Sequence, residues 1–468
     1  MTTKSSKMSS CSKKADTKNI AIIGAGPAGL IAARCSLAEG FNVDVFEQGS
    51  SVGGTWVFTE ETGIDQDGFP VHSAMYKNLR TNVPKELMEV SDFHYPTNMP
   101  TSYIRAEEVL DFFEKYADKF SLKCHIKFNT RVDKVKPVGA SQWNVNTKNL
   151  ETKEISESVY DAILICSGHY SHAYIPNIPG RETFKGIQVH SHDFRSPQIL
   201  SGKKTVVVGY GLSGQDIARV IRQVTDTVFV SHSMKKRPFM PDNLIDRPRI
   251  AKINENSVEF TDGTVENVDA IVYCTGYDYR YPFLTKECGI VVEENKWVRP
   301  LYKGIINIER PTMAFIGLHA ILAVVPMFEL QVRFFLSTMN GHFPLPPKEA
   351  LLKDFEEEVR KKVRFFLSTM NGHFPLPPKE ALLKDFEEEV RKKRERGLQV
   401  RHMHYVGNAE NQAEYFEELA STANIPRIPN VINKIFGNVI KERMTTGIRD
   451  SVYKIVDDEH FQQTYVQG

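Results

Sequence analysis

The sequence predicts an α/β protein with two nested Rossmann-like dinucleotide-binding domains, one inserted into the other. Two observations support this fold class. A buried-strand pattern runs into a GxGxxG turn twice, at residues 24–29 and at residues 209–214. A β-ribbon followed by an apolar strand that stops at Cys-Ser/Thr-Gly also occurs twice, at Cys166 and at Cys274. Each half therefore has the pattern of strand, tight turn and helix, closed by a later strand.

Each glycine in such a turn has its own task. The first makes the turn, the second lets the backbone approach a pyrophosphate, and the third lets the helix pack closely on its strand. The chain is therefore expected to bind two dinucleotides. The expected contacts are Gly24, Gly26 and Gly29 in the first turn, and Gly209, Gly211, Ser213 and Gly214 in the second.

The two strands that end in Cys-Ser/Thr-Gly set the predicted domain boundaries. The chain between them is long enough for one inserted domain, so residues 169–275 form the predicted inner domain. The outer domain is then split into residues 19–168 and residues 276–468. Residues 1–18 are rich in Lys, Ser and Thr and lack an apolar segment, so we expect a disordered basic tail and no signal peptide.

The residue that follows the second strand of each unit distinguishes the two sites. In the first unit this residue is Glu47, whose carboxylate can accept hydrogen bonds from ribose hydroxyls and would repel a 2′-phosphate. In the second unit it is Ser231, and Lys235, Lys236 and Arg237 follow closely. A hydroxyl with nearby cations favours a 2′-phosphate. We therefore expect FAD at the first site and NADPH at the second.

Composition excludes several classes of function. The 468 residues carry a net charge of +1, which gives no electrostatic reason to expect nucleic acid as a partner. The longest apolar run, residues 320–325, is far shorter than the roughly 20 residues that cross a bilayer. We expect a cytoplasmic protein, with a location peripheral to the endoplasmic reticulum membrane as the alternative. The six cysteines show no CxxC pair and no zinc-ligand spacing, so we expect reduced thiols and no metal.

A different kind of repeat lies in the second half of the chain. Residues 332–362 recur without one change as residues 363–393. Solenoid repeats diverge and usually come in threes or more, so an exact pair indicates a recent duplication or an error of sequence assembly. In the first copy the apolar stripe of the predicted helix consists of Leu351, Leu352, Phe355 and Val359. A core shaped for one stripe does not bury two, so we expect one copy to lie on the surface or to be poorly packed.

Two further motifs narrow the function. Gly53-Gly54-Thr55-Trp56 follows Glu47 closely, and its glycines let the backbone pass near a planar ligand that Trp56 can line; a turn with a core tryptophan is the alternative. The pattern FxGxxxHxxx(Y/F) is matched by Phe184, Gly186, His190 and Phe194, between the two glycine turns. With these motifs nearly the whole chain resembles the flavin-containing monooxygenase family. It is most similar to the insect-type members, which include pyrrolizidine alkaloid N-oxygenases.

The resemblance implies particular site residues. Asn82 matches the family's active-site asparagine, whose amide contacts the flavin and the bound NADP, although a turn residue before Val83-Pro84 is an alternative. Gly317 ends a segment that the family shares and is expected to contact a cofactor. His190 belongs to a motif that is largely a linker in the family, so a structural role competes with proton handling. Leu212 departs from the asparagine of many relatives, which removes a possible side-chain hydrogen bond to the cofactor.

The family mechanism implied by the resemblance uses FAD, NADPH and dioxygen. Hydride from NADPH reduces the flavin, a C4a-hydroperoxide forms with dioxygen, and a soft nitrogen or sulfur takes the distal oxygen. We therefore expect N- or S-oxygenation of a small-molecule amine or sulfide, alkaloids among them. The alternatives are a Baeyer–Villiger monooxygenase acting on ketones, which usually has Trp where this chain has Phe194, and a catalytically silent FAD-binding protein. A homo-oligomer is compatible with the sequence, which does not fix the oligomeric state.

Overall fold

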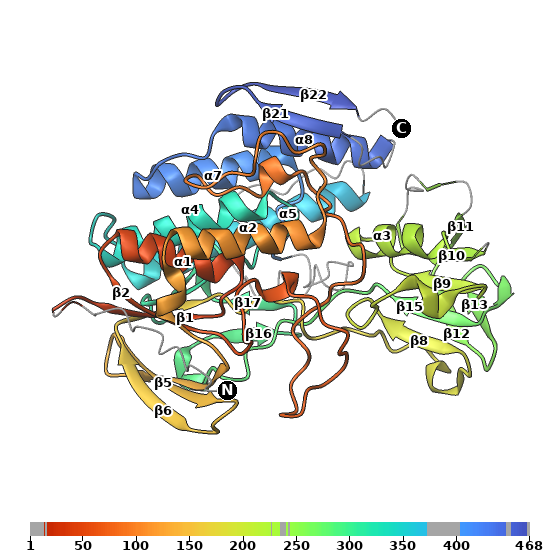
Figure 1. The fold of residues 1–468 in the computed structure, drawn as a ribbon, viewed down its shortest axis with the longest axis horizontal. Coiled ribbons are helices and arrows are strands. Elements are labelled where there is room, and N and C mark those ends of the chain that lie inside the picture. Colours follow the sequence, from red (N-terminus) through yellow and green to blue (C-terminus); the bar gives the residue numbers. More distant parts are fainter. Residues whose placement is uncertain are drawn as a thin grey trace, which may run out of the picture.

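The structure is a computed structural model of the chain. It describes residues 14, 16–225, 227–234, 240–241, 244–371, 403–445 and 451–465, and for residues 363–371 and 444–445 it describes the backbone alone. Two sheets lie in separate lobes connected by extended segments, and helices cover the larger sheet (Figure 1). The fold is therefore the expected α/β arrangement, with one dinucleotide-binding domain inserted into another.

The larger sheet, which belongs to the outer domain, is assembled from two distant parts of the sequence. Its order is β18-β19-β20-β7-β1-β2-β3, and the strands from β20 to β3 are parallel. The strands are β1 (Asn19–Ile23), β2 (Asn42–Phe46), β3 (Ile126–Lys127), β7 (Ala162–Ile165), β18 (Leu301–Tyr302), β19 (Ile306–Asn307) and β20 (Met313–Phe315). Every residue of β2, β7 and β20 is buried, as expected for parallel strands covered on both faces.

The smaller sheet belongs to the inner domain. Its order is β11-β10-β9-β15-β8, and all of its neighbouring strands are parallel. The strands are β8 (Ile187–His190), β9 (Thr205–Val208), β10 (Val228–Ser231), β11 (Leu244–Arg247) and β15 (Ala270–Tyr273). Because they come from a continuous stretch between β7 and β20, the inner domain is nested within the outer one. The boundaries at residues 168/169 and 275/276 stay predictions.

Antiparallel ribbons precede the last strand of each unit, as the sequence predicts. One three-stranded ribbon leads to β7 and the other leads to β15. Their strands are β4 (Thr130–Val138), β5 (Gln142–Asn149), β6 (Ile155–Tyr160), β12 (Ile250–Ile253), β13 (Ser257–Phe260) and β14 (Val265–Asn267). Two hairpins complete the described strands: β16 (Val291–Glu293) with β17 (Trp297–Arg299), and β21 (Ser451–Ile455) with β22 (Phe461–Tyr465).

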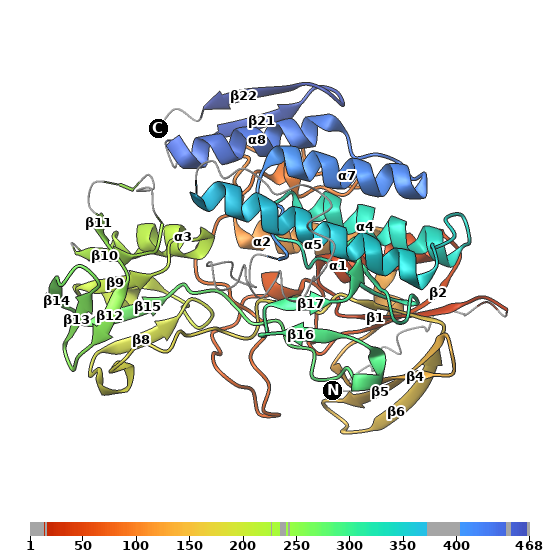
Figure 2. The same cartoon turned by 180° about the vertical axis from the view of Figure 1, so that it is seen from behind.

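Helices of the outer domain form a thick layer on one side of the larger sheet (Figure 2). The α-helices are α1 (Pro27–Ala38), α2 (Ala106–Lys119), α3 (Leu212–Ile221), α4 (Val324–Met339), α5 (Lys348–Asn371), α7 (Ala409–Ala423) and α8 (Asn430–Thr445). The 3-10 helices are η1 (Gly54–Trp56), η2 (Lys85–Leu87), η3 (Leu122–His125), η4 (Arg181–Thr183), η5 (Pro197–Leu200) and η6 (Lys286–Cys288). Among the α-helices that the structure describes, α3 alone packs in the inner domain.

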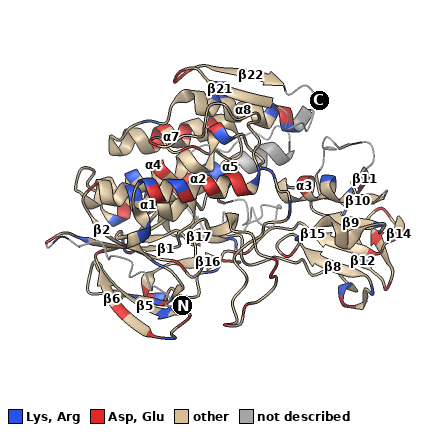
Figure 3. Cartoon of the chain, viewed as in Figure 1, with Lys and Arg blue, Asp and Glu red and all other residues tan. Residues whose placement is uncertain are grey.

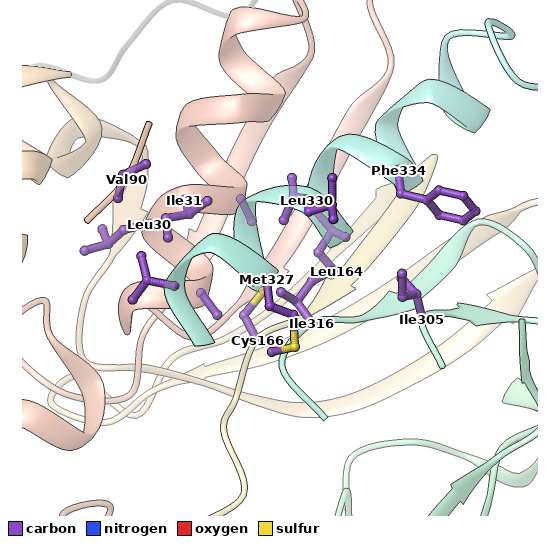
Figure 4. Packing of buried hydrophobic residues seen from close by; sticks show 14 of the residues in the cluster. Leu30, Ile31, Val90, Leu164, Cys166, Ile305, Ile316, Met327, Leu330 and Phe334 are labelled. Atoms are coloured by element: carbon purple, nitrogen blue, oxygen red, sulfur yellow. The ribbon is translucent and has the colours of Figure 1, made fainter. Parts of the chain in front are cut away.

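The largest core cluster lies between α1, α4 and the sheet. Figure 4 shows Leu30 and Ile31 of α1 side by side near Val90, and Leu330 of α4 above Leu164 of β7 in the same cluster. The four leucine and isoleucine side chains have no solvent exposure. Burying a side chain of this size is worth roughly 1.5–3 kcal/mol, so the contact fixes the helix layer on the strands that carry the first glycine turn.

Charged side chains of both signs are interspersed along the surface helices, and α2 is a clear example (Figure 3). Within the described residues, no helix combines the length and the apolar character that a membrane span requires. The expectation of reduced thiols holds for Cys35, Cys166, Cys274 and Cys288, which are free, but it is wrong for Cys124, which is disulfide-bonded.

The chain enters and leaves the inner domain through two segments that pair with each other. Tyr174 N–H donates to the carbonyl oxygen of Gly276 at 2.9 Å, and Asp278 N–H donates to that of His172 at 2.8 Å. The Thr275 hydroxyl adds a hydrogen bond of 2.5 Å to the Tyr174 carbonyl. The two segments after Cys166 and Cys274 therefore lie side by side, and we call this place the crossover junction.

The first copy of the duplicated segment completes the core of the outer domain. Leu351, Phe355 and Val359 on α5 are buried, and the Phe355 ring lies 5.9 Å from the ring of Trp297. Helix α5 then continues without a break into the backbone of the second copy, as far as Asn371. The apolar stripe of the second copy lies outside the described residues, so the expectation that it is left unpacked stays a prediction.

Candidate functional site

The first glycine turn is held by the backbone of the neighbouring strand. Gly24 has φ +104°, and a Cβ there would lie 2.6 Å from the carbonyl oxygen of Cys166. At Gly29 a Cβ would lie 1.9 Å from the carbonyl oxygen of Gly24. At Gly26, in contrast, the closest atom would be 3.5 Å away, which is an ordinary contact. The fold itself demands the outer two glycines, whereas a Cβ at the middle one would only make an ordinary contact with Gly54.

The second turn repeats this geometry in the inner domain. A Cβ at Gly209 would lie 2.5 Å from the carbonyl oxygen of Cys274, and one at Gly214 would lie 2.1 Å from that of Gly209. At Gly211 a Cβ would meet no atom of the described residues within 4 Å. Such a bare approach to the backbone fits a pyrophosphate. Ser213 lies in the first turn of α3, and Leu212 at its start is 39% exposed.

Glu47 connects the end of β2 to the first glycine turn. Its carboxylate is 9% exposed and accepts hydrogen bonds from Ala25 N–H and Gly49 N–H, both at 2.7 Å. Each carboxylate oxygen can accept a second hydrogen bond. The expected contact between Glu47 and a ribose therefore fits the geometry and stays a prediction.

The Gly53-Gly54-Thr55-Trp56 segment lies directly against the first turn. Gly53 N–H donates to the carbonyl oxygen of Ala25 at 3.1 Å, and a Cβ at Gly54 would come within 2.9 Å of the Cα of Gly26. Trp56 in η1 is partly buried and packs against the main core cluster. The core role of Trp56 is thus observed, while contacts of Gly54, Thr55 and Trp56 with a cofactor stay predictions.

Asn82 presents an unpaired amide. Its carbonyl oxygen accepts a hydrogen bond from the Arg443 guanidinium, which lies near the end of α8. Its half-buried side chain makes no hydrogen bond with the described residues. The backbone is therefore anchored, and the amide is left to donate to and accept from a ligand.

Gly317 is anchored by a residue that is not among the predicted site residues. It follows β20 with φ +87°, and its N–H donates to the Gln331 side-chain oxygen at 2.9 Å. The Gln331 amide nitrogen in turn donates to the Tyr415 hydroxyl at 2.8 Å and contacts His319 Nδ1 at 3.2 Å. Gln331 has no solvent exposure, so it fixes the position of Gly317 from inside the core. Gln331 ends the segment Pro326-x-x-Glu329-x-Gln331, whose polar residues on an otherwise apolar helix are the sequence signal that could have indicated it.

Ser231 ends β10 but turns its hydroxyl into the protein. The side chain is 2% exposed and donates to the Pro248 carbonyl oxygen at 2.8 Å. While it makes this hydrogen bond it has no proton to offer a phosphate. The other expected 2′-phosphate contacts, Lys235, Lys236 and Arg237, lie outside the described residues.

His190 of the fingerprint is buried and neutral at physiological pH. Desolvation is the main cause that lowers its pKa to about 4. Its Nδ1 accepts a hydrogen bond from His192 N–H at 3.0 Å. The His192 ring is held in turn by the Asp193 carboxylate and the Val71 carbonyl oxygen, both at 2.8 Å. This chain of contacts is what a structural role for His190 requires, and proton handling by its other nitrogen stays untested.

Arg195, directly after the fingerprint, binds the outer domain to the inner one. It is buried and is not among the residues that the sequence predicts. Its guanidinium donates to carbonyl oxygens of three chain segments at 2.6–3.0 Å: Thr59, Glu61, Ser73 and His192. The residue after the fingerprint motif therefore holds residues 59–73 of the outer domain through hydrogen bonds to their backbone.

The carboxyl edges of the two sheets come together at the crossover junction. The Tyr170 ring, which follows β7, lies 5.2 Å from the Tyr277 ring, which follows β15. Tyr170 is 48% exposed, yet burial raises its pKa to about 12, and burial also lowers the pKa of neighbouring His169 to about 4. The Tyr170 and Tyr277 rings therefore mark the point where the carboxyl ends of β7 and β15 approach each other.

Other catalytic chemistries lack their residues in the described part of the chain. No group of three or more His, Cys, Asp or Glu side chains that could hold a metal occurs there. Desolvation raises the pKa values of the Cys166 and Cys274 thiols far above the usual range, so neither thiol is activated. What this part of the chain does offer is backbone, amides and neutral rings, which suit a bound organic cofactor.

Two nested sheets, each with a glycine turn at its carboxyl edge, define the class of flavin-dependent oxidoreductases with two Rossmann-like domains. The sequence pattern of the flavin-binding monooxygenase-like family matches residues 17–237 and 240–374. The chain belongs to this family, which is one of flavin-dependent monooxygenases.

Similar proteins extend over almost the full length. Senecionine N-oxygenase of Tyria jacobaeae is 30% identical over 464 residues, which cover 97% of this chain and 93% of the relative. Flavin-containing monooxygenase FMO GS-OX3 of Arabidopsis thaliana is 36% identical over 72% of this chain and 77% of its own length. The structure of S-allyl-L-cysteine S-oxygenase from Allium sativum superposes with a TM-score of 0.79, at 29% identity, over 93% of this chain and 95% of that one. The relatives thus include named N- and S-oxygenases.

Proposed function

We propose that the protein is an NADPH- and dioxygen-dependent monooxygenase that transfers one oxygen atom to a nucleophilic nitrogen or sulfur of a small molecule. The second oxygen atom leaves as water, and NADPH supplies the hydride. The observation that carries this proposal is the similarity over 97% of the chain to an enzyme named as an N-oxygenase. An S-oxygenase of nearly the same fold indicates that the shared property of the substrates is a polarisable lone pair.

The two glycine turns divide the cofactors between them. The first turn, Glu47 and Gly317 would hold FAD, and the second turn would hold NADPH. Gly211 supports the assignment of the second turn, because a Cβ there would meet no atom of the described residues within 4 Å. Bound flavin would supply the redox chemistry with dioxygen, and the chain supplies position and shelter.

The chain's own contribution is a set of groups that do not release protons. The Asn82 amide donates and accepts hydrogen bonds without ionising. His169 stays neutral above a pKa of about 4, and Tyr170 stays neutral below a pKa of about 12. A tertiary amine must be unprotonated to use its lone pair, so neutral surroundings keep such a substrate reactive. The similarity to an enzyme named as an N-oxygenase supports amines as the substrate class, and the similarity in fold to an S-oxygenase supports sulfides next.

A product screen tests the proposal. The purified, flavin-loaded protein is incubated with NADPH, air and a panel of tertiary amines, thioethers and ketones, and mass spectrometry follows the gain of one oxygen atom. We expect N-oxides or S-oxides together with NADPH consumption. NADPH oxidation that yields hydrogen peroxide and no oxygenated product would contradict monooxygenation. Ester formation from ketones would instead show Baeyer–Villiger chemistry, and protein that binds no flavin would indicate a silent relative.

A further inference from the structure

A cleft opens beyond the carboxyl ends of β10 and β11 in the inner domain. Figure 1 shows these two strands in the smaller lobe. Its volume is about 450 Å³, within the roughly 300–1,000 Å³ of small-ligand sites. It is lined from β10 onward by His232, Ser233 and Met234, and from β11 onward by Asp246 through Arg249. In a dinucleotide-binding fold this edge, beside the strand after the glycine turn, receives the adenosine ribose.

A ring contact connects this cleft to the second glycine turn. Tyr210, between Gly209 and Gly211, stacks on His232 with ring centroids 6.2 Å apart and an interplanar angle of 29°. His232 therefore lines the cleft and contacts the turn through Tyr210. A dinucleotide with its pyrophosphate at Gly211 would extend its ribose past these rings toward the cleft.

The charged groups of the cleft are not equally available. Arg247 is paired with Glu266 at 2.5 Å and lies over the Phe229 ring. Asp246, the carboxylate among the lining residues, is held 2.9 Å from His232 Nε2. Arg249 is exposed, and its guanidinium makes no ion pair or hydrogen bond with the described residues. Arg249 is thus the cation that can turn to a new partner.

We propose that Arg249 selects NADPH by binding the 2′-phosphate of its adenosine ribose. Guanidinium and phosphate form paired charge-assisted hydrogen bonds, which an adenosine without the 2′-phosphate cannot offer. The role that the sequence assigns to the Ser231 hydroxyl passes to this residue, because that hydroxyl donates to Pro248. The inference rests on the proposed use of NADPH.

Calorimetric binding of two nucleotide fragments to the flavin-loaded full chain tests Arg249 without any turnover. The probes are 2′,5′-ADP, which carries the 2′-phosphate, and 5′-AMP, which lacks it. In Arg249→Gln we expect binding of 2′,5′-ADP to weaken by about tenfold or more, with 5′-AMP binding unchanged. Arg249→Lys should retain part of the preference, since a point charge replaces a fork. Arg181→Gln, before β8 at the opposite edge of the sheet, is the matched control and should behave as the wild type.

The outcomes separate this inference from the proposed function. If the wild type prefers 2′,5′-ADP and Arg249→Gln keeps that preference, Arg249 is not the selecting residue and NADPH use stands. Loss of affinity for both probes in equal measure would mean an adenine contact and would also overturn the inference. A parallel Arg237→Gln variant that abolishes the preference, beside an unaffected Arg249→Gln, would return selection to the basic run. A wild type that does not distinguish the probes contradicts NADPH selectivity itself.

Discussion

The Tyr76 hydroxyl of the outer domain donates a hydrogen bond to the Asp216 carboxylate, which lies on α3 of the inner domain. The Tyr76 ring also packs edge-on against the Phe194 ring, at 5.5 Å between centroids. With Arg195 beside it, this contact joins the two dinucleotide-binding domains at a place distinct from the crossover junction. The orientation of the inner domain is therefore fixed at two places.

Tyr76→Phe should weaken this second contact between the domains, because it removes the hydroxyl but keeps the ring that packs against Phe194. It leaves the Asp216 carboxylate with one hydrogen bond fewer, and a bond to a charged group contributes about 1.5–3 kcal/mol. We expect a lower unfolding temperature and faster proteolysis between the domains, measured by calorimetry and limited digestion. Tyr465→Phe is the control, because Tyr465 also donates to a carboxylate but is 65% exposed. Equal effects of the two variants would contradict a special role for Tyr76.

Asn82→Ala should separate flavin binding from oxygenation. The side-chain amide makes no bond with the described residues, so its loss should leave the unfolding temperature nearly unchanged. Removal of one positioned donor costs about 10²–10³ in kcat where it acts in the transition state. We expect the variant to keep its flavin spectrum while the rate of oxide formation falls by about that factor. Asn98→Ala, in an exposed loop, should match the wild type in both measurements; unchanged oxygenation in Asn82→Ala would assign that residue to the turn.

Stability should fall with pH in a window that His190 defines. Its pKa is about 4 in the folded chain against an ordinary value of 6.5, so the unfolded chain binds a proton that the folded chain refuses. Stability is therefore complete above pH 6.5 and is lost as the pH falls toward 4. His190→Asn, whose side-chain oxygen can still accept from His192 N–H, should make the denaturant-measured dependence on pH less steep in this window. Part of the slope should remain, because burial also lowers the pKa of His169 to about 4. His94→Asn, at an exposed position, should leave the curve unchanged; an identical curve for His190→Asn would show that His190 does not contribute.

The exact duplication offers an internal control. Phe355 on α5 is 7% exposed and stacks on Trp297, so Phe355→Ala should cost about 3–5 kcal/mol in the free energy of unfolding. Phe386→Ala changes the identical residue of the second copy and should cost almost nothing if one stripe alone is packed. Deletion of residues 363–393 should likewise preserve the fold, because the first copy fills the core. A large loss of stability from Phe386→Ala would show that both copies are buried.

Sequence patterns are reliable here where the determining contacts are local. The turns at Gly24 and Gly209 were predictable because a side chain at either position would clash with the neighbouring strand, at the carbonyl oxygen of Cys166 or Cys274. The hydroxyl of Ser231 was not, because its partner depends on the parallel register of β10 with β11, which places Arg247 opposite Ser231 and Pro248 just beyond. The register between two strands cannot be deduced from the sequence of either strand alone.

The same distinction explains the residues that escaped prediction. Arg195 donates to carbonyl oxygens of residues more than a hundred positions earlier in the chain. Because every residue has a backbone carbonyl, the sequence does not indicate which ones Arg195 contacts. In the sequence, Gln331 is one amide on a mostly apolar helix. Its partners Gly317 and Tyr415 come close to it only in the folded chain, so its role could not be predicted. In both cases the residue type was visible and its partners were not.

The paired crossovers at Gly276 and Tyr174 mean that the chain goes out to the inner domain and returns at almost the same point. Because the two ends of the inserted domain lie side by side, the insertion does not disturb the pairing of strands in the outer sheet. Such a unit could be exchanged whole for the corresponding unit of a relative, with coenzyme preference moving with it. If the proposed function holds, oxygenation and coenzyme selection are properties of two domains that the chain joins at a single junction.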